Sequence, residues 1–308
     1  MNVFIAGGSG TIGIPLVRAL VADGHAVTAM TRSSNKQDEL RRMGASVLVA
    51  DALNRDAVIA AVHAAKPTHV IHQLTALPRS GPRRSGDVNA TNRLRIDGTR
   101  HLLEAAIHAG VRRFVAGSFA LLAPRDARDP RDPRDPMIAQ SNDPAAAAVA
   151  SMEKQVLETT AHGFIEGIIL RYGMFYGLDV PSNIAMIDMV RKRRLPVVRK
   201  DASQLPFIHL EDAVSATLRA LESAPAGSIY EIVDDHAFCF SEIVEIIAEL
   251  SNSAKPFKVP AWLPRVVSPY LTRMTSIRLP LSNARAKSEL GWRPKYKTMR
   301  EGLAHMFY

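Results

Sequence analysis

Glycine is concentrated near the amino terminus, in the run AGGSGTIG that spans residues 6–13. An apolar stretch typical of a strand precedes this run, and an amphipathic helical pattern follows it. In such a unit, glycines allow a tight turn and let backbone N–H groups approach an anion at the amino terminus of the helix. The confirming context of strand and helix makes the motif far more specific than a glycine triplet alone. The residues predicted to cradle the phosphates of a dinucleotide are Gly7, Ser9, Gly10, Thr11, Ile12 and Gly13.

A second polar feature lies where the next expected strand ends, in the sequence MTRSS at residues 30–34. An acid at this position would bind the ribose hydroxyls of NAD, and the sequence has none there. Arg32 can instead form a bidentate pair with a 2′-phosphate, assisted by Ser33 or Lys36. The sequence therefore favours NADP(H) over NAD(H). An Arg32 that only ends the strand in solvent stays an open alternative.

These groups need a scaffold that brings the ends of several strands together. Short apolar runs alternate with helical periodicity through the first half of the chain, which is typical of a parallel sheet covered by crossover helices. Strands are expected at residues 2–6, 26–31, 46–50, 69–72, 113–117 and 167–171. Helices are expected at residues 11–22, 55–65 and 91–109, with a fourth that ends near residue 161. We therefore expect an α/β fold with a doubly wound parallel sheet of the Rossmann type.

The periodic pattern loosens after Tyr172, which indicates a smaller carboxy-terminal substrate lobe. The expected dinucleotide-binding domain covers residues 1–171, and residues 203–225 return to it through a strand at 207–209 and the helix that follows. Residues 172–202 and 226–308 are assigned to the lobe. The segment 123–136 repeats Arg-Asp with prolines and is predicted to be a solvent-exposed loop.

Composition narrows the class of protein. The chain has 308 residues, of which 47% are hydrophobic, with a formal net charge of +9 and a single cysteine, Cys239. These values exclude a disordered chain, a disulfide framework and a thiolate metal site. No metal site is expected. We expect a cytoplasmic protein, because the single cysteine gives no sign of an oxidising compartment, the amino terminus lacks a signal-peptide pattern and no apolar run reaches the ~20 residues of a membrane span. The positive charge has no nucleic-acid-reading motif beside it, which favours a small-molecule substrate and argues against nucleic acid as a partner.

Further motifs resemble the extended short-chain dehydrogenase/reductases, in the branch of NAD-dependent epimerases and dehydratases. They follow the glycine loop in order, as VAD at 49–51, GT at 98–99, GVRRFV at 110–115, LRYGMFYG at 170–177, PFIHLEDA at 206–213 and ELGWRP at 289–294. The resemblance covers nearly the whole chain, and the order of its short motifs is specific. It implies that Asp51 and Ala52 contact the adenine and that Ser118 lies beside the nicotinamide. It also implies that the cofactor ribose is bordered by Leu74, Thr75 and Ala76, and that a homodimer forms through the helices near 91–109 and 144–161.

The catalytic pattern of that family is altered here. Its members usually carry Tyr-x-x-x-Lys on the helix after the fifth strand, where the lysine lowers the pKa of the phenol for proton exchange. All six tyrosines of this chain lie at or beyond Tyr172, and none has lysine four residues later. If Lys154 is aligned with the family lysine, the tyrosine position holds Ala150. If Glu153 is aligned with the glutamate that often follows the pair, the two positions hold Ala145 and Val149.

Two neighbouring positions depart from the pattern as well. Phe119 occupies the position of the usual active-site Ser or Thr, one residue after Ser118, and Arg95 replaces an asparagine. The candidates for a substitute catalytic role are Lys154, Ser118 and Tyr172, with Tyr176 and His209 as further acids or polarising groups. For each, an ordinary structural role stays open.

Hydride transfer requires chiefly a nicotinamide held against an electrophilic carbon, so the loss of the tyrosine is compatible with a reductase. The sequence favours an NADPH-dependent oxidoreductase acting on a small, partly apolar carbonyl or imine-like substrate. A non-catalytic NADP(H)-binding sensor or scaffold is the second hypothesis. A nucleotide-sugar epimerase or dehydratase with relocated catalytic groups is the third.

Overall fold

A seven-stranded parallel sheet forms the centre of the described part of the chain, in the order β10-β6-β5-β4-β1-β2-β3. The computed structural model describes residues 1–78, 85–124, 143–267 and 269–307. The sheet strands are β1 (Asn2–Ala6), β2 (Ala26–Thr31), β3 (Ser46–Val49), β4 (His69–His72), β5 (Arg113–Phe119), β6 (Glu166–Tyr172) and β10 (Ile229–Ile232). Each crossover brings the next strand into parallel register, so the carboxyl ends of all seven strands share one edge.

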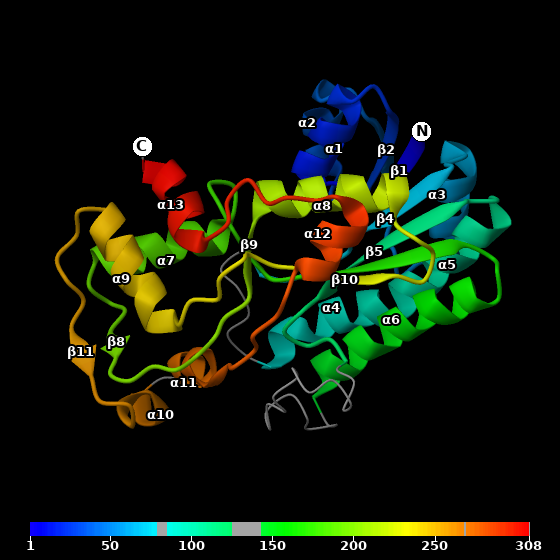
Figure 1. Cartoon of the computed structure of the whole chain (residues 1–308). Helices are drawn as coiled ribbons and strands as arrows, with labels where there is room; N and C mark the ends of the chain where they lie inside the picture. The colour runs from blue at the N-terminus through cyan, green and yellow to red at the C-terminus, as the bar shows by residue number, and fades with distance from the viewer. Residues whose placement is uncertain (79–84, 125–142, 268, 308) are drawn as a thin grey trace.

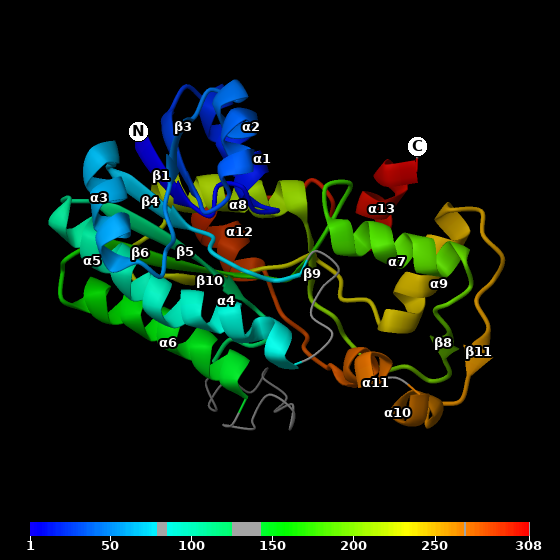
Figure 2. The same ribbon diagram turned by 180° about the vertical axis from the view of Figure 1, so that it is seen from behind.

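Helices cover both faces of this sheet (Figures 1 and 2). One face carries α1 (Gly13–Ala22), α2 (Gln37–Arg42), α8 (Leu210–Ser223) and α12 (Ala284–Leu290). The other carries α3 (Arg55–Ala65), α4 (Asn89–Arg93), the π-helix η3 (Leu94–Gly98), α5 (Thr99–His108) and α6 (Pro144–Ala161). Strand β1 shows how the sequence separates the two cores, because Val3 and Ile5 pack on the first face while Phe4 and Ala6 pack on the second.

A smaller lobe lies beside the sheet and contains its own apolar core (Figure 1). Its strands form two short parallel pairs, β7 (Met174–Tyr176) with β9 (Phe207–His209) and β8 (Val197–Val198) with β11 (Lys258–Val259). Its helices are α7 (Pro181–Arg191), α9 (Phe240–Leu250), α10 (Leu263–Val267), α11 (Pro269–Ser276) and α13 (Met299–Phe307). Two 3-10 turns, η1 (Ser34–Lys36) and η2 (Ser85–Val88), complete the regular elements that the structure describes.

The strand boundaries differ from expectation in the second half of the chain. Residues 207–209 were expected to return to the main sheet, but β9 pairs with β7 outside it. Gly173 ends β6 and its N–H donates to Ile232 O, so the chain leaves the main sheet before β7 and β9 pair. The seventh sheet strand is β10, which lies within the residues 226–308 that the sequence assigned to the lobe. The four-residue strands β3 and β4 were recognisable from the regular alternation of strands and helices around them, and that alternation is lost after Tyr172, where β10 lies.

Two further expectations concern the Arg-Asp-Pro segment and the absence of a membrane span. Most of the Arg-Asp-Pro segment, residues 125–136, lies outside the described residues. None of the helices that the structure describes is long and apolar enough to cross a membrane.

Candidate functional site

The glycine loop joins β1 to α1 and packs tightly against its own start. Gly7 has a φ of +89°, and a Cβ there would lie 2.6 Å from the Gln73 carbonyl oxygen at the end of β4. A Cβ on Gly13 would lie 2.2 Å from the carbonyl oxygen of Gly7. Both contacts are with backbone atoms, so no side chain can be accommodated without moving the loop.

The loop leaves several donors free at the start of α1. The N–H groups of Gly7 and Gly8 donate to Met30 O, and that of Gly10 donates to Gly7 O. In the described structure no backbone acceptor is found for the N–H groups of Ser9, Thr11 and Ile12. Free N–H groups at the amino terminus of a helix bind anions, and the helix dipole adds to the attraction. These residues therefore fit the pyrophosphate of a dinucleotide.

The end of β2 lies next to this loop. The hydroxyls of Ser9 and Thr31 are hydrogen-bonded at 2.7 Å, and the Ser33 N–H donates to Thr31 Oγ1 at 3.1 Å. Arg32 is exposed, and no ion pair joins it to any residue in the described ranges. Lys36, by contrast, is paired with Glu39 at 2.7 Å. Arg32 therefore remains available to a ligand, whereas Lys36 already has a partner.

The ends of β3 and β4 carry the residues expected around the adenine and the ribose. Asp51 is exposed, and its carboxylate accepts the Leu53 N–H at 3.0 Å. Ala52 is buried, and its carbonyl is bonded to His101 Nδ1 at 3.0 Å. Of the three residues expected along the ribose, Leu74, Thr75 and Ala76, the second is exposed and the other two are half-buried. The glycine loop contacts this strand end through Gly7 and Gln73, so the expected cofactor residues share one edge of the sheet.

Ser118 belongs to a buried polar network rather than to an open surface. Its hydroxyl donates to Glu153 Oε1 at 2.6 Å, and Glu153 also accepts from Arg171 Nε at 2.9 Å and Nη2 at 2.7 Å. Arg171 further pairs with Glu231 on β10 at 3.3 Å. The network ties β5, α6, β6 and β10 together.

The orientation of Glu153 selects between the two alignments of α6. The inward face of this helix carries Ala145, Ala148, Val149, Met152, Glu153 and Val156, all buried. Ala145, Val149 and Glu153 follow each other at four-residue intervals on that face. Lys154 points outward, with 72% of its side chain exposed, and pairs with Glu158 at 3.6 Å. The geometry favours the alignment in which alanine and valine occupy the positions of the family pair.

The structure does not bring the three sequence candidates for catalysis together. Lys154 is on the outer face of α6, whereas Ser118 points toward Glu153. The Tyr172 phenol is buried, accepts from Gln73 Nε2 at 3.1 Å and lies 2.7 Å from Thr217 Oγ1. Burial raises the pKa of Tyr172 to about 12, which disfavours proton exchange near neutral pH.

Tyr176 and His209 lie where the lobe joins α8. Tyr176 is fully buried and donates to Asp234 Oδ2 at 2.9 Å and to the Thr298 carbonyl at 3.2 Å. His209 caps α8, because its Nδ1 accepts the Glu211 N–H at 3.3 Å, and burial lowers its pKa to about 4. Both side chains therefore have structural contacts that account for their burial.

Arg95 is a buried charged residue. From the sequence it was identified only as a replacement for an asparagine of the family pattern. It is 8% exposed within η3, and the described residues offer it no hydrogen bond or ion pair. Burial, together with the Arg95 charge, lowers the pKa of the neighbouring His72 to about 4. The four-residue spacing of Thr91, Arg95 and Thr99 was the available signal for a shared inward face, but no sequence pattern indicated that Arg95 would lack a partner among the described residues.

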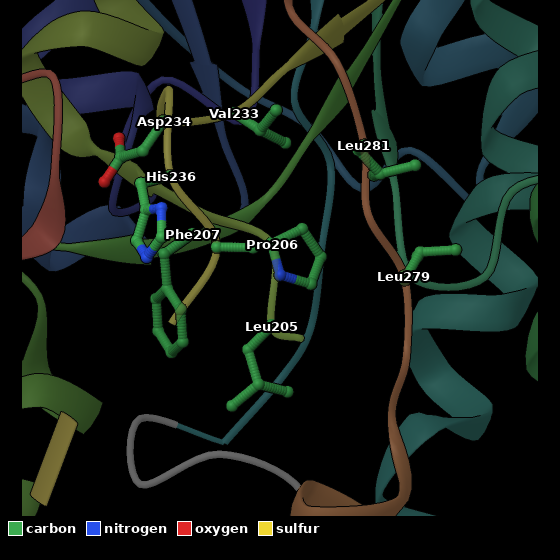
Figure 3. A pocket seen from close by; sticks show the side chains of 9 residues that line it. Leu205, Pro206, Phe207, Val233, Asp234, His236, Leu279 and Leu281 are labelled. Carbon is green, nitrogen blue, oxygen red and sulfur yellow. The ribbon is translucent and has the colours of Figure 1, made fainter. Parts of the chain in front are cut away.

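A small pocket lies beyond the carboxyl end of β10 (Figure 3). Its lining is mostly apolar and comes from the residues before β9, the residues after β10 and the segment near 280. The lining residues are Leu205, Pro206, Phe207, Val233, Asp234, His236, Ala237, Leu279 and Leu281. Its empty volume of about 180 Å³, which includes open solvent, is below the roughly 300–1,000 Å³ of typical ligand sites, so this pocket is too small to hold a substrate by itself.

Known proteins resemble this chain in sequence and in structure. A 3-diazoavenalumate denitrifying reductase from Streptomyces sp is 36% identical, covering 98% of this chain and 99% of its own length. A 4-hydroxy-2-methyl-3-oxo-4-farnesyl-3,4-dihydroquinoline-1-oxide ketoreductase from Stigmatella aurantiaca is 26% identical, covering 76% of this chain and 68% of its own. The solved UDP-glucose 4-epimerase of Thermus thermophilus, a complex with NAD, superposes with a TM-score of 0.75 at 23% identity, over 98% of this chain and 96% of that one.

These relatives include reductases, which supports an oxidoreductase, and the likeness in structure establishes the shared fold. The family model described as NAD dependent epimerase/dehydratase matches residues 3–233. The chain therefore belongs to the NAD dependent epimerase/dehydratase family.

Proposed function

We propose that the protein is an NADPH-dependent reductase that transfers hydride to a small, partly apolar electrophile. The observation that carries this proposal is the contrast between the intact anion cradle of the glycine loop and the inward face of α6, where Ala145 and Val149 stand in place of a proton-donating pair. A site of this kind suits reactions whose main requirement is a positioned hydride donor. Epimerase and dehydratase chemistry, which relies on that proton relay, is correspondingly disfavoured.

The acceptor class follows from the same reasoning. Carbonyl and imine-like groups remain candidates when water supplies the proton. The Streptomyces relative is a denitrifying reductase of a diazo compound, and its substrate name, an avenalumate, is that of the anion of an acid. Hydride addition to a diazonium carbon forms a C–H bond, breaks the C–N bond and releases N2 with its electron pair, so no proton is needed at the reacting atom. An acceptor of this type would suit a site without the phenol.

Arg32 supports the choice of NADPH. Its side chain is exposed at the end of β2 and has no ion-pair partner among the described residues, and the neighbouring Thr31 hydroxyl bonds to Ser9 of the glycine loop. A bidentate pair with a 2′-phosphate is a charge-assisted interaction, which is stronger than a neutral hydrogen bond. Replacement of Arg32 by alanine should weaken NADPH binding about tenfold or more and leave NADH binding nearly unchanged.

The decisive experiment is a turnover screen on the purified protein. NADPH deuterated at the transferring carbon is incubated with an aryl diazonium salt, an aryl aldehyde and an aryl imine, and mass spectrometry follows deuterium in each product. Transfer to any of these acceptors supports the reductase, and N2 release with the first identifies denitrification. Tight NADPH binding without transfer to any acceptor would favour the alternative, a non-catalytic NADP(H)-binding sensor or scaffold.

The Arg32 variant is compared with Lys36→Ala, a matched control in which the cation already pairs with Glu39. Binding of NADPH and NADH is titrated in both variants. If Arg32→Ala weakens the two cofactors equally, the 2′-phosphate contact is wrong and NAD(H) becomes the better choice.

A further inference from the structure

Arg95 is unusual among the buried arginines because it has no counter-ion within the described residues. Arg113, which is similarly buried at 7% exposure, donates to Glu166 at 2.9 Å and to the carbonyls of Ala220 and Leu221 at 3.2 and 2.9 Å. Arg95 is 8% exposed and makes no such contact within the part of the chain that the structure describes. A buried cation without a partner is costly, and the described residues supply no counter-charge, so we consider a bound ligand as its source.

The helix face on which Arg95 lies is set by its neighbours one turn away on each side. Thr91 Oγ1 accepts the N–H of Ala76, and Thr99 Oγ1 is bonded to His72 Nε2 at 2.8 Å. Both contacts are with the carboxyl end of β4 and the residues that follow it. Arg95 lies between these two threonines, so its side chain is on the face of α4, η3 and α5 that packs on this edge of the sheet. The influence of its charge on the pKa of His72 agrees with that position.

A second polar group nearby also lacks a partner. Asn92 is 8% exposed, and its Oδ1 is buried without a hydrogen bond to any described residue. Asn92 precedes Arg95 by three residues, which places the two on adjoining positions of the helix surface. The local helix is a π-helix, a distortion that is frequent at functional sites. A cation and an acceptor thus lie together, both buried and both unpaired within the described ranges.

The chemistry of this pair indicates what would occupy it. A guanidinium matches a carboxylate in shape and charge and can donate two parallel hydrogen bonds to it. The phosphates of the dinucleotide are accounted for by the free N–H groups of the glycine loop and, at the 2′ position, by Arg32. The nicotinamide ribose is neutral. Among the described residues and the cofactor, no group supplies an anion to Arg95, which leaves the substrate as the candidate to supply it.

We propose that Arg95 binds a carboxylate of the substrate, with Asn92 Oδ1 accepting an N–H or O–H group from the same molecule. This inference rests on the proposed reductase function and specifies its substrate as a small, partly apolar acid. Arg95 is a substrate-binding residue in this scheme and takes no part in the hydride or proton transfer.

The test measures binding without turnover. Isothermal titration of the NADP⁺-saturated protein compares cinnamate with cinnamamide, a neutral compound of nearly the same shape. The wild type should bind cinnamate about ten- to a hundredfold more tightly than the amide, the range expected for hydrogen bonds to a charged group. Arg95→Gln should abolish this preference, and Arg95→Lys should keep part of it. Arg93→Gln, which removes an exposed arginine from the same helix, should bind both probes as the wild type does.

Three results would overturn the proposal. The first is a wild type that binds cinnamate no more tightly than cinnamamide. The second is an Arg95→Gln variant that keeps the preference. The third is an Arg95→Gln variant that loses NADP⁺ affinity by the same factor as cinnamate affinity, which would assign the guanidinium to the cofactor. A preference for cinnamate that depends on Arg95, found in a protein that transfers no hydride to any of the acceptors in the screen, would count against the reductase and leave the anion site intact.

Discussion

Two arginines with little exposed surface near the carboxyl edge of the sheet have opposite surroundings. Arg171 on β6 lies between Glu153 and Glu231, with N–O distances of 2.7 and 3.3 Å, and Ser118 completes the network. Arg95 on η3 is similarly buried and has no partner among the described residues. The first joins four elements of the fold, whereas the second contributes no contact that would hold the described part of the protein together.

The different surroundings of Arg171 and Arg95 indicate different roles, stabilisation of the fold for the first and ligand binding for the second. A buried ion pair offsets the cost of desolvation only when its geometry and hydrogen bonding are good, as they are in the bidentate pair between Arg171 and Glu153. An unpaired charge leaves that cost uncompensated in the free protein and recovers it when a ligand supplies the opposite charge. Such strain is tolerated at functional sites and is rare elsewhere. The Arg171 network is therefore expected to dominate folding, and Arg95 to dominate recognition.

The largest effect is expected when these two arginines are each replaced by methionine. Arg171→Met leaves the buried Glu153 carboxylate without its cation, and the free energy of unfolding should fall by about 3–5 kcal/mol. Arg95→Met removes a desolvated charge that has no partner among the described residues, so stability should stay the same or rise slightly. Urea unfolding followed by circular dichroism measures both.

The control for this pair is Arg93→Met on the exposed side of α4, which should change stability little. A loss of stability in Arg95→Met as large as that in Arg171→Met would mean that Arg95 is structural. The contrast between the two arginines would then be false.

A smaller effect concerns His72, which lies beside Arg95. Its Nδ1 accepts the Leu74 N–H, so the neutral ring carries its proton on Nε2 and bonds to Thr99. Burial, with the Arg95 charge, lowers the pKa of His72 to about 4. Since the unfolded value is about 6.5, the neutral ring stabilises the fold above pH 6.5. This contribution, roughly 3 kcal/mol, should be lost as the pH falls from 6.5 toward 4.

Two variants test whether His72 causes the loss of stability in acid and whether Arg95 contributes to its low pKa. His72→Asn should flatten the acid limb of the stability profile, leaving the part due to His209, whose pKa is also about 4. Arg95→Met should raise the pKa of His72 toward its ordinary value, which NMR titration of the ring protons reports. An unchanged His72 pKa in Arg95→Met would show that the guanidinium does not lie beside the imidazole.

The sequence was most informative about the strands and helices of the first half of the chain and about the glycine loop, where backbone geometry restricts the residue type. The bounds of β1, β2, β4 and α3 match the expected ranges residue for residue, because apolar runs and clear breaks delimit them. The glycine loop was readable because tight turns and close approaches restrict a position to glycine. Arg32 could be placed at the carboxyl edge of the sheet because it directly follows a recognisable strand.

The remaining features depend on contacts between distant parts of the chain. Strand β10 is four residues long and joins the sheet only because β6 accepts it as a neighbour. Whether Glu153 or Lys154 faces inward could not be decided from the sequence, because both alignments were open. The pairing of Arg171 and the isolation of Arg95 have the same local appearance in sequence, an arginine beside apolar residues. Only the tertiary arrangement distinguishes them.

The smallest effect is expected on the opposite side of the helix that carries Glu153. Lys154→Met removes an exposed cation whose contact is a 3.6 Å pair with Glu158, and exposed pairs of this kind contribute roughly 0.3–0.5 kcal/mol. Both stability and the rate of hydride transfer should therefore stay close to wild type, whereas Glu153→Gln, one residue earlier, should lower stability strongly by weakening the pair with Arg171. Steady-state kinetics with the substrate found in the acceptor screen, combined with urea unfolding, compares the two variants. A large fall in kcat for Lys154→Met with unchanged stability would assign the lysine to catalysis and restore the alignment in which Ala150 holds the tyrosine position.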